Sequence, residues 1–96
     1  MTENPYIKLI LFYSNFNPES IRSRIAIWEL VDRYARLSKI VLEEVNYDVA
    51  DPTQKLYKVN GTPVLIILRD QKIIRRYLGK VEVEEMEQIM DNLFKR

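Results

Sequence analysis

The chain alternates between short apolar runs and longer stretches in which apolar residues recur with helical spacing. Residues 7–13 (IKLILFY) form a continuous apolar run rich in β-branched and aromatic side chains, with Asn4-Pro5 before it and Ser14-Asn15 after it. A run of this length and composition is typical of a strand that is buried on both faces. It therefore predicts a sheet that is covered by helices on both sides.

A long helix is predicted after this strand. Asn17 followed by Pro18 is typical of a helix start, because an Asn side chain caps the first turn and proline needs no N–H donor there. The basic residues Arg33, Arg36 and Lys39 are expected in its last turns. One set of apolar residues has the spacing of a buried stripe and a second set widens it. The first set is Ile21, Ile25, Trp28, Val31 and Ala35, and the second is Ile27, Leu30, Tyr34 and Leu37. We therefore expect a mostly buried helix with Trp28 in the core.

The rest of the chain shows the same two kinds of pattern. They predict strands over residues 39–47, 64–68 and 73–78, a short helix that opens at Asp51-Pro52 and continues to Tyr57, and a last helix over residues 83–94. The polar residues 69–72 are expected to join two of the strands into a hairpin. No linker or repeat interrupts this order, so residues 1–96 are interpreted as a single domain with the order β-α-β-α-β-β-α.

The amino-acid composition excludes several classes of chemistry. The 96 residues include no Cys and no His, which excludes disulfides, a Ser-His-Asp triad and the usual protein ligands of zinc or haem. We therefore predict no metal site and no cofactor. A formal net charge of +1, from 15 basic and 14 acidic residues, argues against a nucleic-acid partner. Apolar runs are too short to span a membrane, so the chain is predicted to be soluble and cytoplasmic.

The basic residues Arg69, Lys72, Arg75 and Arg76 gather around the predicted hairpin. Strand alternation would put Arg75 and Arg76 on opposite faces of the sheet, which favours a solvated sheet edge over one coherent basic patch. Few glycines, no cysteine and many charged residues suit a heat-adapted chain. This composition would fit a thermophile of archaeal or viral origin.

The element order, combined with three local features, resembles the thioredoxin and glutaredoxin superfamily over residues 6–94. The features are the four-residue turn Asn17-Pro18-Glu19-Ser20 that opens the long helix, the step Gly61-Thr62-Pro63 before a strand, and Leu78-Gly79 after the hairpin. The resemblance implies a thioredoxin-like α/β fold, with a mixed four-stranded sheet flanked by helices. It also implies that Pro63 is a cis-proline and that the backbone before it is open to an extended peptide or glutathione.

The departure from the family is at the turn, where its members carry Cys-x-x-Cys. Asn17 stands in the position of the nucleophilic cysteine, and Ser20 in that of the resolving cysteine. Disulfide exchange requires a thiolate, and an Asn amide cannot replace it. The resemblance therefore implies a cysteine-less, redox-inactive member, and thiol–disulfide oxidoreductase activity is excluded. We predict that the chain is not an enzyme.

The function that this pattern favours is protein binding or assembly. We expect Phe16, the former active-site turn at residues 17–20, and Thr62-Pro63 to form a docking surface for an extended segment of another protein. Backbone hydrogen bonds before Pro63 would supply affinity, and an exposed Phe16 would supply an apolar contact. Purely structural roles stay open, because Asn17 also serves as a helix cap and Pro63 also shapes the entry to a strand.

Two alternatives belong to other classes. One is a glutathione-binding or transferase-like enzyme that uses the hydroxyl of Ser20 or Tyr13 instead of a thiol, although no His is present as its base. The other is a protein that self-associates, as a homodimer, through the apolar first helix. Glutathione binding together with turnover of a model electrophile would favour the first alternative. A stable dimer that becomes a monomer when Trp28 or Tyr34 is made charged would favour the second.

Overall fold

The computed structural model describes residues 6–35 and 39–94, and these fold into four strands and three helices. In chain order they are β1 (Tyr6–Tyr13), α1 (Pro18–Tyr34), β2 (Lys39–Asn46), α2 (Pro52–Leu56), β3 (Val64–Arg69), β4 (Lys72–Leu78) and α3 (Val83–Phe94). The β-α-β-α-β-β-α order that the sequence predicts is confirmed.

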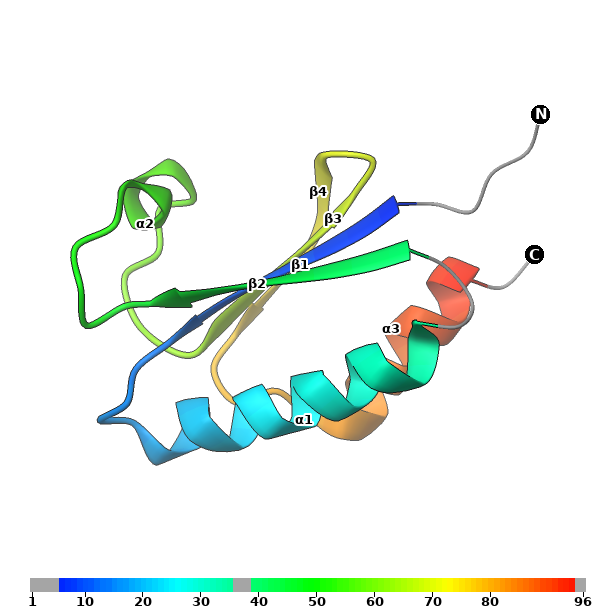
Figure 1. Cartoon of the computed structure of the whole chain (residues 1–96), viewed down its shortest axis with the longest axis horizontal. Helices are drawn as coiled ribbons and strands as arrows, with labels where there is room; N and C mark the ends of the chain where they lie inside the picture. The colour runs from blue at the N-terminus through cyan, green and yellow to red at the C-terminus, as the bar shows by residue number, and fades with distance from the viewer. Residues whose placement is uncertain (1–5, 36–38, 95–96) are drawn as a thin grey trace.

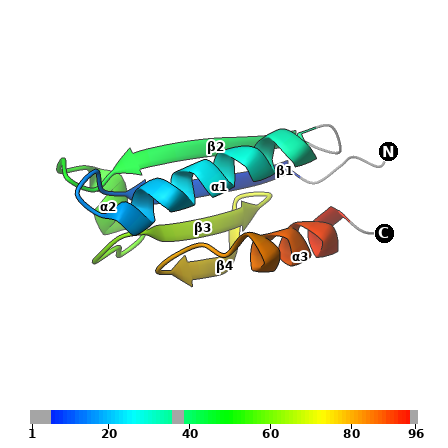
Figure 2. The ribbon, with the colours of Figure 1, turned by 90° about the horizontal axis from the view of Figure 1, so that it is seen from below.

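The strands form one mixed sheet in the order β2-β1-β3-β4. Strand β1 is central, parallel to β2 and antiparallel to β3, and β4 pairs antiparallel with β3 at the far edge. Figure 1 shows α1 and α3 on one face of the sheet and α2 on the opposite face, near the ends of β1 and β2. In Figure 2, α1 lies over β1 and β2, and α3 lies beside it on the β3-β4 side.

The two faces of β1 fill two separate hydrophobic clusters, as the apolar run predicts. Under α1 and α3 the cluster consists of Ile7, Leu9, Leu11, Ile27, Leu30, Tyr34, Leu65, Ile67, Val81, Met86 and Met90. On the α2 face it consists of Ile10, Phe12, Val45, Val59, Val64, Ile66 and Leu68. Helix α2 contributes no buried residue, so the flanking Tyr47 and Tyr57 pack against this second cluster instead. The α2 face is therefore covered less completely than the α1 face.

The predicted hairpin joins β3 to β4 through a two-residue turn. Asp70 and Gln71 have φ values of +51° and +73°, the left-handed pair that matches the twist of a tight hairpin. Register pairs Arg76 with Ile66 and Arg75 with Ile67, so the two guanidinium groups belong to opposite faces of the sheet. The expectation that these cations line an exposed sheet edge is confirmed.

The length of the first helix differs from the prediction. Helix α1 ends at Tyr34, and Lys39 begins strand β2 instead of closing the helix. Arg36 and Leu37, which were also expected in the helix, lie outside the described residues.

The expected buried stripe of α1 is wrong at four of its five positions, whereas Val31 is partly buried against the core and the second predicted set is buried at Ile27, Leu30 and Tyr34. Ile21, Ile25 and Trp28 are 42%, 50% and 45% exposed, so Trp28 is not a core residue, and Ala35 is exposed as well. The buried face of the helix consists of Ser20, Ser23, Ile27, Leu30 and Tyr34. Two small serines on that face let the first half of α1 approach the rest of the fold closely, which turns the other apolar set toward solvent. The helix is therefore not mostly buried.

No helix of residues 6–35 and 39–94 combines the length and apolar character that a membrane span requires. Over the same residues, His, Cys, Asp and Glu side chains form no group of three or more that could hold a metal ion.

Candidate functional site

Asn17 links the start of α1 to the segment before β3. It is the N-cap residue: Oδ1 accepts a hydrogen bond from the Glu19 N–H at 2.9 Å, and Pro18 occupies the first helical position. The other end of the same amide donates, with Nδ2 lying 2.9 Å from the carbonyl oxygen of Thr62. The predicted cap is confirmed. Sequence reasoning missed the second bond because its partner is 45 residues away along the chain.

The loop between β1 and α1 is fixed by the carboxylate of Asp48. Ser14 Oγ donates to Asp48 Oδ1 at 2.7 Å, and the Asn15 N–H donates to Oδ2 at 3.0 Å. The Ser14 hydroxyl in turn accepts from the Phe16 N–H at 3.1 Å. These bonds hold the main chain of Phe16 while its side chain stays 86% exposed, which confirms the predicted exposure. No local motif pointed to Asp48, which lies just beyond β2.

The segment before β3 forms the second half of the candidate site. The peptide bond between Thr62 and Pro63 is cis, and Pro63 is buried. The Pro63 carbonyl accepts a hydrogen bond from the Gly79 N–H at 2.9 Å, which ties this segment to the end of β4. Gly79 has φ +94°, a conformation that favours glycine. Thr62 thus has its carbonyl bonded to Asn17, while no main-chain group in the described residues accepts from its N–H.

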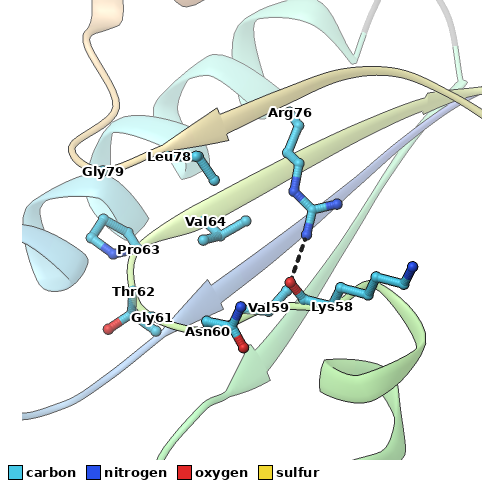
Figure 3. Close-up of a pocket in the computed structure, with 10 residues that line it drawn as sticks. All are labelled: Lys58, Val59, Asn60, Gly61, Thr62, Pro63, Val64, Arg76, Leu78 and Gly79. Atoms are coloured by element: carbon cyan, nitrogen blue, oxygen red, sulfur yellow. Dashed lines mark hydrogen bonds between the residues drawn. The ribbon is translucent and has the colours of Figure 1, made fainter.

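A cavity of about 530 Å³ borders this segment on the α2 face of the sheet (Figure 3). Its volume falls in the range of small-ligand and side-chain pockets. Its lining includes four apolar residues, Val59, Pro63, Val64 and Leu78, and four polar or charged ones, Lys58, Asn60, Thr62 and Arg76. The Arg76 guanidinium donates to the carbonyl of Lys58 at 3.2 Å and to that of Tyr57. The lining of the cavity therefore combines apolar residues with two basic ones, Lys58 and Arg76.

The two hydroxyl groups considered as substitutes for a thiol are differently exposed. Ser20 is completely buried, and its Oγ has no hydrogen-bond partner in the described part of the chain. Tyr13 is half-buried, and its ring lies under the Arg24 guanidinium at 4.1 Å. A dissolved ligand cannot contact Ser20 unless the start of α1 moves. This burial argues against an enzyme that uses the Ser20 hydroxyl.

Solved structures similar to this chain are thioredoxins. Thioredoxin-2, a component of the malaria parasite protein secretion machinery, superimposes with a TM-score of 0.81 at 14% identity, covering 96% of this chain and 87% of its own. The germline-specific thioredoxin Deadhead from Drosophila melanogaster gives 0.78 at 18% identity, covering 92% and 81%. A single-site variant of thioredoxin from Halobacterium salinarum gives 0.79 at 14% identity, covering 98% and 78%.

These similarities extend over nearly the whole described chain, but at 14–18% identity they show the fold alone. No family model and no curated protein sequence matches the chain. The fold is thus thioredoxin-like, as the resemblance implied, and the sequence that adopts it has no cysteine. The chain lacks the thiolate that attacks a disulfide in thiol–disulfide exchange.

Proposed function

We propose that this chain is a redox-inactive thioredoxin-like domain that binds an extended segment of another protein. The binding site would be the turn–proline surface, defined as Phe16, residues 17–19 and Thr62-Pro63, with the buried Ser20 beneath it. The observation that carries the proposal is the 2.9 Å hydrogen bond from Asn17 Nδ2 to the Thr62 carbonyl. It joins the two halves of this surface through an amide, at the position where the family resemblance implies a reactive thiol.

Phe16 supports a role in protein contacts. An aromatic side chain that is 86% exposed loses much apolar surface to water when a partner covers it. Its main chain is already held through Ser14 and Asp48, so binding orders few additional groups. The exposed ring and the fixed backbone therefore both favour a contact between Phe16 and a partner.

The backbone before Pro63 supports an extended partner. The Thr62 N–H is available as a donor, and the Thr62 carbonyl keeps one lone pair beyond the bond to Asn17. A strand-like segment could therefore pair with Thr62 and place a side chain into the 530 Å³ cavity beside Pro63.

The cytoplasmic location and the heat-adapted origin suggested by the composition stay predictions.

Screening a library of random short peptides against the immobilised protein tests the proposal. Enriched peptides should shift the amide NMR signals of Phe16, Asn17, Gly61 and Thr62. Phe16→Ala and Pro63→Ala should weaken the binding of these peptides, whereas Ile73→Ala should leave it unchanged. Ile73 is a suitable control because it is 49% exposed and lies on β4. It pairs there with Leu68, at the end of the strand that is distant from Pro63. The amide spectrum of each variant shows whether its fold is retained.

Two results would contradict the proposal. One is a set of peptides whose signals map elsewhere on the domain, and the other is equal binding by the wild type and both site variants. Reduced glutathione, titrated separately, distinguishes the enzyme alternative. We expect no shift at residues 17–20 at millimolar concentration, because the Ser20 hydroxyl is buried.

A further inference from the structure

The outer face of α1 carries an apolar stripe that the rest of the described chain covers only in part. Ile21, Ile25 and Trp28 recur at i, i+4 and i+7, so they form one continuous row along the helix. All three are exposed by between two fifths and one half of their surface. We call this row the α1 stripe. It shares no residue with the turn–proline surface.

Trp28 is held in a fixed orientation although it is exposed. Its Nε1–H donates to Glu44 Oε2 on β2 at 2.9 Å. The same carboxylate accepts from Arg24 Nε at 2.9 Å, and this bond raises the pKa of Arg24. The Arg24 guanidinium lies 4.9 Å from the centre of the Trp28 ring on one side and 4.1 Å from that of Tyr13 on the other. An indole fixed in this way contributes to an interface with little loss of side-chain entropy.

Charges beside the stripe indicate what covers it. Arg22 and Glu29 are seven residues apart, so they lie on the same flank of the stripe, and both are exposed. Neither forms an ion pair with another described residue, in contrast to Arg33, which pairs with Glu87. A two-fold axis perpendicular to α1 would bring this flank against the same flank of a second copy in reverse order. Arg22 would then face Glu29 of the partner subunit, and Glu29 would face Arg22 of the partner subunit.

We propose that the α1 stripe is the interface of a homodimer in which the two α1 helices pack antiparallel, with the two-fold axis close to Ile25. Ile25 packs on Ile25 of the partner subunit, and Trp28 packs toward Ile21 of the partner subunit. Two ion pairs between Arg22 of one subunit and Glu29 of the other flank one side of this row. A parallel arrangement would instead set this flank against the opposite flank of the partner subunit, where Arg24 lies, so Arg22 would meet a like charge. The self-complementary charges therefore select an antiparallel second copy.

The interface is small. One pair of helices buries less than the roughly 800 Å² per partner of a standard protein interface, so dimerisation should be weak and dependent on concentration. The net charge of +1 adds little long-range repulsion between two copies. Because the turn–proline surface lies outside the stripe, the dimer keeps that surface available on both subunits. The two proposals can therefore succeed or fail independently.

Sedimentation equilibrium over a concentration series tests the dimer. We expect reversible association for the wild type and a monomer at all concentrations for Ile25→Glu, because two carboxylates would meet at the axis. Ile73→Glu is the matched control: it adds the same charge at an exposed isoleucine on β4 and should dimerise like the wild type. A wild type that stays monomeric at about millimolar concentration, or a control that loses dimerisation equally, would overturn the proposal.

A charge exchange tests the antiparallel arrangement specifically. Arg22→Glu and Glu29→Arg each bring like charges together and should weaken the dimer by about tenfold or more. The double variant restores opposite charges across the axis and should regain most of the wild-type affinity. Single variants that dimerise like the wild type, or a double variant no better than the singles, would refute this geometry.

Discussion

The two faces of α1 contrast in a way that hydropathy alone does not indicate. Its buried face begins with two serines, Ser20 and Ser23, and becomes apolar only in the second half of the helix. The outer face carries Ile25 and Trp28 in contact with solvent. Ser23 Oγ accepts a hydrogen bond from the Val81 N–H at 3.1 Å, so the first half of the helix packs against the segment that leads into α3. Side-chain size and a buried hydrogen bond, and not only apolar content, decide which face turns inward.

The largest expected effect separates the two apolar sets of the helix. Ile27→Ala should lower the free energy of unfolding by about 2–4 kcal/mol, because Ile27 is completely buried between α1 and β1. Ile25→Ala, the same substitution on the outer face, should cost less than about 0.5 kcal/mol in the monomer. Denaturant unfolding at low protein concentration measures both. Equal losses of stability in the two variants would contradict the assignment of Ile27 to the buried face and Ile25 to the exposed face of α1.

The elements with local signals were predictable from the sequence. The apolar run of β1, the Asn17 cap and the polar hairpin turn each specify their own structure within a few residues. The orientation of α1 was not predictable, because both apolar sets have helical spacing and a periodicity argument cannot rank them. The two serines were the available signal, since small residues at i and i+3 mark a face that approaches its neighbour closely.

The candidate site was predictable only in part. Phe16 and Pro63 stand next to turn signals in the sequence, so both were identified. The bonds that assemble the site were not, because Asn17 to Thr62 and Ser14 to Asp48 span 45 and 34 residues. Such contacts depend on how the strands are ordered in the sheet, which the sequence supplied only through a family resemblance.

A second effect concerns the buried polar half of α1. Ser23→Ala should lower the free energy of unfolding by about 1–3 kcal/mol, because it leaves the buried Val81 N–H without an acceptor. Ser23→Thr keeps the hydroxyl and separates the lost bond from a change in packing. Hydrogen exchange of the Val81 amide provides a local readout, and it should accelerate in Ser23→Ala. If Ser23→Ala leaves both the exchange rate of the Val81 amide and the free energy of unfolding unchanged, the hydrogen bond between Ser23 and Val81 is not formed.

At the start of the same helix, Asn17→Ala should cost about 1–2 kcal/mol, because both the cap and the bond to Thr62 are lost. Asn17→Ser divides these two contributions. A serine caps a helix about as well as asparagine but is too short to replace the bond to the Thr62 carbonyl. Unfolding measurements should therefore give Asn17→Ser an intermediate stability. If serine matches asparagine fully, the bond to Thr62 contributes nothing to the fold.

At the other end of the buried face, Tyr34 makes stability depend on alkaline pH. Burial, together with a hydrogen bond to Asp91, raises the pKa of Tyr34 from 10.0 to about 12. The unfolded chain therefore loses this proton at lower pH than the folded chain does, and the contribution of Tyr34 is complete below pH 10 and declines between pH 10 and 12. Unfolding experiments across this range should show a shallower decline for Tyr34→Phe. Identical slopes would exclude Tyr34 as the source.

The smallest expected effect is that of Ser20→Ala, and its sign is opposite to that of Ser23→Ala. Ser20 Oγ is buried and has no hydrogen-bond partner among the described residues, in contrast to Ser23 three positions later. Ser20→Ala removes this unpaired hydroxyl, so the free energy of unfolding should stay unchanged or rise by up to about 1 kcal/mol. The same denaturant unfolding that measures Ser23→Ala gives the matched value. A loss comparable to that of Ser23→Ala would mean that the Ser20 hydroxyl forms a hydrogen bond in solution.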